Sequence, residues 1–231
     1  MPTTIPMARS TTSTTMTDAS LIRLMSWLSP VFPTGSYAYS AGLEQAVAEN
    51  TICSVPDLGN WLKALLDRGA PWNDAVLLGA AWHNCSDKAE ISHLAGLAEA
   101  LAGSAERHRE MADQGRAFLA AARHWFDGDL PATLPLPVAI GLACGRTKVP
   151  LGATLAAYLN TVVSNQLQCA IRLSVTGQDG AARLLAQLEP VIADVAARAA
   201  TSTLDQLGSF AFRAEIASMN HETLQRRLFL S

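Results

Sequence analysis

The sequence is poor in aromatic residues and in charged residues, which make up 6% and 16% of its 231 residues. Val, Ile, Tyr and Phe are scarce beside Ala and Leu, and no hairpin dipeptide lies between alternating apolar runs. Both absences argue against a β-sheet protein. The hydrophobic fraction of 49% is still large enough for a sizeable core, so we expect that core to be helical.

Dense runs of basic residues and long runs of apolar residues are also missing. The formal net charge is -3 and Lys and Arg form no dense run, so nucleic acid is not an expected partner. No window of about 18 uncharged apolar residues occurs, so neither a membrane span nor a membrane partner is expected.

Residues 1–20 are rich in Thr and Ser and lack the apolar segment of a secretory signal. We predict that they form a flexible N-terminal segment.

Motifs for metal binding or catalysis are absent as well. The four cysteines form no C-x-x-C pair and are predicted to be small buried residues of a reducing compartment, the cytoplasm. The five histidines form no H-x-x-x-H pair and are predicted at or near the surface. Neither a phosphate-binding loop nor a G-x-S-x-G nucleophile turn is present. We therefore predict no catalytic residue, no metal site and no tightly bound cofactor.

Apolar residues at helical spacing predict the fold. Leu58, Trp61, Leu62 and Leu65 form one such stripe, which should begin near Ser54 and end before Gly69. Breaks are expected near Gly103 and in the proline-rich stretch 127–137, and Pro190 should kink or split the helix over 181–200. The sequence predicts a single all-α domain over residues 21–231, a bundle of roughly eight to ten helices of ordinary length.

One segment does not fit a simple bundle: WLSPVFPTGSYAYSAGLEQAV, residues 27–47, which we call the opening stretch. Pro30 and Pro33 make it semi-rigid and extended, and Gly35 permits a turn with positive φ. Its tyrosines, Tyr37 and Tyr39, have two possible roles that the sequence leaves open. They could be buried as a wedge against the bundle, or they could belong to a shaped docking surface.

The second unusual segment is the tail, about residues 210–231. It finishes with Leu228, Phe229 and Leu230 next to two arginines. Chain ends usually fray, and exposed apolar side chains at a mobile end reduce solubility unless they are covered. We expect either the domain's own core or a groove on a partner to cover them.

Both segments resemble one family. The pattern LSPVFPTGSYAYSAGLE, residues 28–44, resembles the N-terminal signature of the urease accessory protein UreF family. GSFAFRAEIASMNHETLQRRLFLS, residues 208–231, is similar to the ending of that family, and shorter motifs between them follow in the expected order. Ala41 stands where the family often has His, so any role of that His is not available here. Asn220 stands where a basic residue is common.

The resemblance implies an all-α accessory protein that is not an enzyme. It implies binding to the accessory protein UreD, called UreH in some organisms, and to the GTPase UreG. Together these proteins deliver nickel to apo-urease, so nickel would be cargo and not a bound cofactor. The family is described as dimeric and as regulating UreG. The partner-binding residues expected from its motifs are Pro30, Phe32, Pro33, Gly35, Tyr37, Tyr39, Ser40, Gly42, Leu43, Glu44, Ser218, Met219, His221, Glu222, Arg227, Leu228 and Phe229.

Two further hypotheses concern single residues. An arginine acting in trans on the GTPase is one way to stimulate it, and Arg116, Arg172 and Arg227 are the candidates. Arg116 and Arg172 lie outside the two terminal motifs, on predicted helices. The alternative function is a nickel-binding helical protein or a small helical enzyme that uses His221 together with Glu222 or a cysteine.

Overall fold

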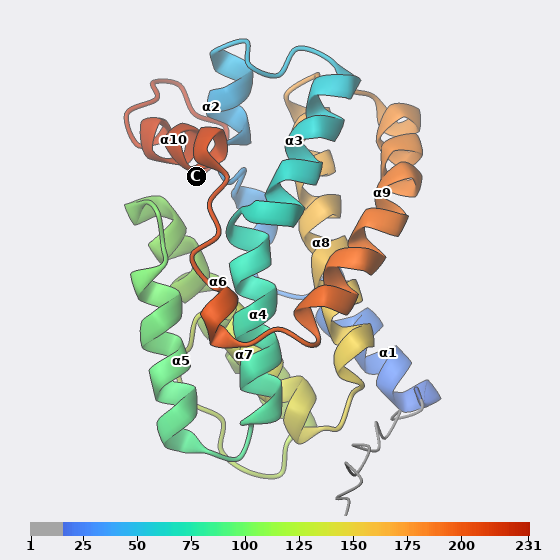
Figure 1. Ribbon diagram of the computed structural model, residues 1–231, viewed down its shortest axis with the longest axis vertical. Helices are drawn as coiled ribbons and strands as arrows, with labels where there is room; N and C mark the ends of the chain where they lie inside the picture. Colours follow the sequence, from blue (N-terminus) through green and yellow to red (C-terminus); the bar gives the residue numbers. More distant parts are fainter. Residues whose placement is uncertain (1–15) are drawn as a thin grey trace, which may run out of the picture.

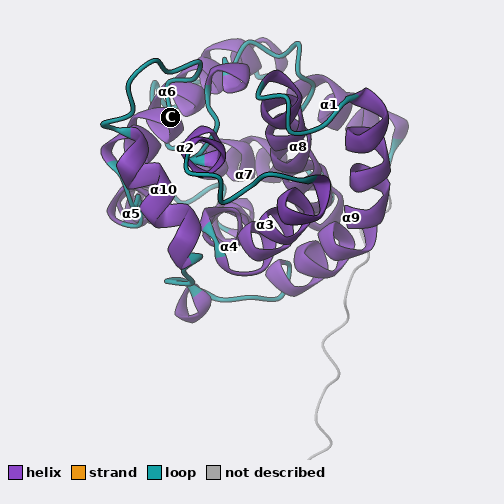
Figure 2. Cartoon of the chain, turned by 90° about the horizontal axis from the view of Figure 1, so that it is seen from above, coloured by secondary structure: helices purple, strands orange, loops and turns teal. Residues whose placement is uncertain are grey.

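The computed structural model describes residues 16–231, and over these residues it contains only helices and loops (Figures 1 and 2). The predicted all-α fold is thereby confirmed. Most of the predicted flexible segment, residues 1–15, lies outside the described residues, and residues 18–20 already belong to the first helix. The α-helices are α1 Asp18–Trp27, α2 Leu43–Ala48, α3 Val55–Arg68, α4 Ala70–His83, α5 Lys88–Ala100, α6 Ala105–Ala122, α7 Leu136–Arg146, α8 Leu151–Arg172, α9 Gln178–Ala199 and α10 Phe212–His221.

Helix α4 is the centre of the bundle. It packs against α3, α5, α7, α8 and α9, and nearly every residue from Pro71 to Gly79 is buried. Such a helix is apolar around its whole circumference, as expected for one enclosed by others. Figure 1 shows α4 between the α5 side and the α8–α9 side of the molecule. Of these neighbours, α3, α5, α8 and α9 each leave their outer side exposed.

Helix α7 lies unusually close to α4 because glycine occupies the contact positions. A Cβ atom at Gly141 would lie 2.4 Å from the main-chain oxygen of Leu78, and one at Gly145 would lie 2.5 Å from that of Trp82. Neither distance can accommodate a side chain. The spacing of these two glycines along α7 therefore permits close packing of α7 on α4.

Most predicted helix boundaries are confirmed. The Ser54 side chain accepts a hydrogen bond from the Asp57 main-chain N–H at the start of α3, and α5 and α6 are separated around Gly103. The split that was one of the two outcomes predicted at Pro190 does not occur, because α9 runs through it without interruption. Pro190 is exposed, and the buried residues Leu188 and Ile192 on either side keep that face of α9 against α3 and α8.

A buried ion pair joins three of the helices. Arg107 on α6 pairs with Asp74 on α4 and, at 3.1 Å, with Glu110, and Tyr158 on α8 donates a 2.7 Å hydrogen bond to Asp74. Burial opposes the charge of Arg107, but the two carboxylates raise its pKa well above the ordinary value. Burial also raises the pKa of Tyr158 well above its usual range, so its hydroxyl remains a donor. This cluster fixes the position of the first turns of α6.

The opening stretch divides its aromatic residues between core and surface. Phe32 packs against Phe118 and Trp125 with ring centroids 5.6 and 6.1 Å apart. Gly35 adopts the predicted positive φ, 74°. Tyr39 is buried and Tyr37 is 71% exposed, so the wedge interpretation holds for Tyr39 and not for Tyr37.

The prediction for the cysteines is correct for two of four. Cys144 and Cys169 are buried, and burial raises the pKa of both thiols to about 12. Cys85 is partly buried, and the prediction is wrong for Cys53, which is exposed in the loop before α3.

Among the helices described, none combines the length and the apolarity that crossing a bilayer requires.

The contact between α4 and α7 generates the first prediction. Gly141→Ala should lower the free energy of unfolding by about 1–3 kcal/mol, because the new methyl group must displace the α4 backbone. Gly96→Ala is the matched control, since nothing lies within 4 Å of its Cβ position inside α5. The free energy of unfolding of that variant should rise by about 0.5–1 kcal/mol, because alanine has a lower backbone entropy than glycine in the unfolded chain. Urea denaturation followed by circular dichroism measures both, and equal effects would contradict the packing described.

Candidate functional site

The two unusual segments of the sequence meet in one place. Helix α10 packs on α2, as Figure 1 shows. Beyond α10 the chain turns back, and its last part, Leu224–Ser231, which we call the end segment, runs over the opening stretch. Leu230 donates a main-chain hydrogen bond to Ala38 at 2.7 Å, and Ser40 donates one to the Ser231 main-chain oxygen at 2.6 Å.

The close approach of α10 to α2 depends on Gly42. Its φ is 81°, a conformation that side chains rarely adopt, and a Cβ atom would lie 2.7 Å from the main-chain nitrogen of Ser218. Glycine thus serves two purposes here: it starts α2 in the left-handed region, and it leaves room for α10. This accounts for a glycine directly before Leu43.

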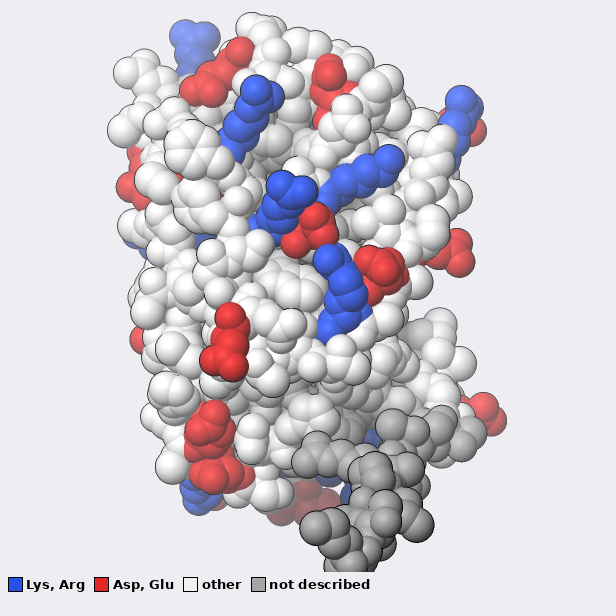
Figure 3. Space-filling model, in the orientation of Figure 1, with Lys and Arg blue, Asp and Glu red and all other residues white. Residues whose placement is uncertain are grey.

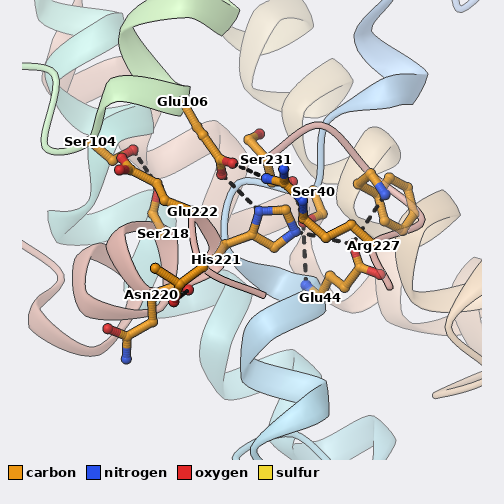
Figure 4. Close-up of polar contacts among 12 residues, drawn as sticks. Ser40, Glu44, Ser104, Glu106, Ser218, Asn220, His221, Glu222, Arg227 and Ser231 are labelled. Carbon is orange, nitrogen blue, oxygen red and sulfur yellow. Dashed lines mark hydrogen bonds and ion pairs between the residues drawn. The ribbon is translucent and has the colours of Figure 1, made fainter. Parts of the chain in front are cut away.

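His221 is at the centre of the contact between the two segments (Figure 4). Its Nδ1 lies 2.7 Å from a carboxylate oxygen of Glu106, and its Nε2 lies 3.1 Å from one of Glu44. The prediction of a surface histidine is wrong, because His221 is completely buried. Only the protonated imidazolium donates from both nitrogens, so a charged ring satisfies both carboxylates at once.

The end segment completes the coordination of both carboxylates. Glu44 accepts hydrogen bonds from the main-chain N–H groups of Leu228 at 2.7 Å and Phe229 at 3.1 Å. Glu106 also pairs with Arg227 at 2.5 Å. Glu44 and Glu106 are only 5% and 7% exposed, and a buried carboxylate costs several kcal/mol unless its oxygens are bonded. The bonds that offset this cost come from the tail.

The same region caps helix α6. The hydroxyls of Ser104 and Ser218 are hydrogen-bonded at 2.8 Å, and Glu222 accepts the main-chain N–H of Ala105 at 2.8 Å. Acidic groups at a helix N-terminus satisfy free N–H groups and are favoured by the helix dipole. Glu106 lies in this first turn as well. The residues after Ala217 therefore stabilise the beginning of α6, and the same bonds hold these residues in place.

The apolar residues of the end segment point in two directions. The Phe229 ring is 3% exposed and lies under the Arg172 guanidinium, 4.1 Å from the ring centroid. Arg172 also donates to the Tyr37 main-chain oxygen at 2.7 Å. Leu228 and Leu230, in contrast, are each 60% exposed. The core of this chain thus covers Phe229, and both flanking leucines remain on the surface beside the opening stretch.

The residues expected from the motifs divide by exposure. Their role in partner binding stays a prediction, and the buried ones offer little surface to a partner while the end segment is in place. The buried residues are Tyr39, Ser40, Gly42, Leu43, Glu44, Ser218, His221 and Phe229. Phe32 and Gly35 are partly buried, and Pro30, Pro33, Tyr37, Met219, Glu222, Arg227 and Leu228 are exposed.

Sequence reasoning missed two members of this site. Glu106 is the second partner of His221, and Ser104 bonds to α10; both lie at the start of α6. A Ser followed two residues later by Glu does signal a helix N-terminus, which is where they lie. Nothing in the sequence links that helix start to a histidine 115 residues further on.

The geometry bears on the hypothesis of a metal or enzyme site at His221. Both ring nitrogens face carboxylates of Glu44 and Glu106, and Glu222 is directed to Ala105 instead of to the ring. Within residues 16–231 no group of three or more His, Cys, Asp or Glu is arranged to hold a metal ion. The cluster is arranged as a buried ion network, and no observation favours that hypothesis.

Comparison with known proteins gives a consistent result. The family model described as UreF matches residues 52–189. The chain is 50% identical over 223 residues to urease accessory protein UreF 1 of Brucella anthropi, and the matched region covers 95% of this chain and 97% of that protein. It is 52% identical over 216 residues to urease accessory protein UreF of Brucella ovis, covering 91% and 94%. The UreF protein of Agrobacterium fabrum is 49% identical over 216 residues, covering 92% and 97%.

The buried network generates the second prediction. His221→Ala leaves Glu44 and Glu106 buried without their shared partner, and should lower the free energy of unfolding by about 3–5 kcal/mol. Asn220→Ala is the matched control on the exposed side of the same turn and should stay within about 0.5 kcal/mol of wild type. Chemical denaturation of the two variants makes the comparison. Similar stability for both would show that the carboxylates do not depend on the histidine.

Proposed function

Because this chain belongs to the UreF family of urease accessory proteins, we propose that it is a non-catalytic scaffold in urease maturation. In this proposal the protein joins UreD and the GTPase UreG on apo-urease, and it regulates UreG while nickel is passed to the urease active site. It acts in the cytoplasm as a homodimer, and it holds no nickel as a cofactor of its own. These finer roles rest on the resemblance of the two terminal motifs and on the site described above.

The observation that carries the proposal is a surface formed jointly by both motifs, which we call the terminal surface. It consists of Tyr37, Leu228 and Leu230, exposed by 71%, 60% and 60%. The main-chain hydrogen bond from Leu230 to Ala38 joins the two segments that carry them. Large apolar side chains gathered at one place on a folded surface are typical of protein interfaces.

The buried network supports this surface from below. Glu44 bonds to the main chain at Leu228, and Arg172 bonds to the main chain at Tyr37. A surface fixed in this way loses little conformational entropy when a partner binds, which increases affinity for a given contact area. We propose that UreD binds the terminal surface. Burial of each leucine there would contribute about 1.5–3 kcal/mol.

The third prediction tests this assignment. The double variant Leu228→Asp, Leu230→Asp should fold normally, because both side chains are exposed, and it should lose UreD binding by at least tenfold. The control Ala182→Asp, Gln187→Asp adds the same charge on the exposed side of α9 and should bind UreD as wild type does. Co-purification and isothermal titration with UreD measure both. Unchanged binding by the leucine variant would place the UreD site elsewhere.

Of the three candidate arginines, Arg116 is the most available to act on UreG. Arg172 lies over Phe229, and Arg227 pairs with the buried Glu106. Arg116 pairs only with Asp113 on the same helix, at 2.6 Å, and its side chain is 65% exposed. Surface pairs of this kind contribute little to stability, so the guanidinium can exchange its partner for a phosphate group at small cost.

The fourth prediction concerns GTP turnover. If the protein stimulates UreG through an arginine in trans, Arg116→Ala and Arg116→Lys should both remove most of that stimulation, since lysine lacks the planar fork. Arg183→Ala is the matched control, because Arg183 forms a similar surface pair with Asp179 on α9. Phosphate release by UreG is the measurement. Full stimulation by Arg116→Ala would mean that regulation works by positioning UreG instead.

A further inference from the structure

A second apolar surface lies apart from the terminal surface. It is a groove of about 810 Å³ between α3, α9 and residues 210–214 at the start of α10. Trp61 and Leu65 of α3 and Val191 and Val195 of α9 line its apolar part. The opening stretch contributes no residue to it, and the tail contributes only residues 210–214. We call it the α3–α9 groove.

Two exposed phenylalanines stand at one edge of this groove. Phe210 and Phe212 are 50% and 67% exposed, and their rings form an edge-to-face pair with centroids 6.0 Å apart. Exposure of two neighbouring aromatic side chains to this extent is energetically unfavourable, and the core of this domain accommodates other large residues. Their placement beside an apolar groove indicates that something covers both.

The charges around the groove define the occupant further. Its carboxylates already have partners: Asp67 bonds to Arg68 and Arg198, and Asp194 bonds to Arg198. Asp57, which also lines the groove, accepts hydrogen bonds from the Ser54 hydroxyl and the Cys53 main-chain N–H. The hydrogen bond from Arg198 is the main cause of a lowered pKa at Asp67, so this carboxylate stays ionised.

The cations Lys63 and Arg213, which also line the groove, lie within ion-pairing distance of no carboxylate among residues 16–231. Figure 3 shows basic side chains gathered over the middle of the face that carries α3 and α9. An occupant with a carboxylate fits this edge.

We propose that the α3–α9 groove binds a peptide segment of a protein partner in which a bulky apolar side chain lies beside an acidic residue. The apolar side chain packs beside Trp61 between α3 and the two phenylalanines. The acidic residue pairs with Lys63 or Arg213. This inference rests on the proposed function, because the partner is one of the proteins of the urease assembly. It adds a second contact surface, distinct from the one assigned to UreD.

The test is photo-crosslinking in the assembled complex. Benzoylphenylalanine replaces Ala64, an exposed residue that lines the groove, in the full chain co-expressed with UreD, UreG and the urease subunits. Ala182, exposed on α9 outside the groove, is the matched control position. Size-exclusion chromatography first establishes that the complex forms. Position 64 should then crosslink to a partner protein at an apolar residue next to Asp or Glu, several-fold more than position 182 does.

Charge reversal provides the second measurement. Lys63→Glu should reduce the crosslink from position 64 several-fold, and more strongly at low salt than at high salt, whereas Lys88→Glu on α5 should leave it unchanged. A crosslink to a second copy of this chain, or none above the control in a complex that forms, overturns the proposal. Failure of the complex to form with the wild-type chain contradicts the proposed function itself, and the groove assignment falls with it.

Discussion

Two buried carboxylates that share one histidine determine how the two ends of this protein are arranged. Glu44 comes from the opening stretch and Glu106 from the first turn of α6, and both face His221 of α10. Neither carboxylate is stable in the interior without partners. The partners are His221, Arg227 and the main-chain N–H groups of Leu228 and Phe229, all of which lie near the end of the chain. The end segment is therefore needed to satisfy charges that lie elsewhere in the core.

This constraint changes the meaning of the apolar tail. The sequence left open whether its own domain or a partner covers the terminal leucines and Phe229. The structure divides them: Phe229 is buried in this chain, and Leu228 and Leu230 face outward. The network below them holds their backbone in place, so the exposed pair belongs to a rigid surface instead of a segment that must fold on binding. A surface whose backbone is already fixed loses little conformational entropy on association.

The helical framework was predictable because it depends on local patterns. The apolar stripe of α3, its Ser54 cap and the break near Gly103 all appear within short windows of sequence. Pro190 does not split α9, since the tertiary contacts of Leu188 and Ile192 outweigh the local effect of proline. The burial of His221 was not predictable, because its partners are 177 and 115 residues away. The resemblance of the two motifs named most of the residues of the site without indicating that they touch one another.

The most direct test of this account is amide hydrogen exchange in the isolated protein. The N–H groups of Leu228 and Phe229 bond to Glu44 in the folded monomer, so they should exchange at least about a hundredfold more slowly than in an unstructured peptide, with no partner present. The exposed neighbour Gln225 provides the internal reference for a free amide. Exchange of Leu228 and Phe229 at the unstructured rate would show that the end segment is not held by its own chain, and would contradict the central claim.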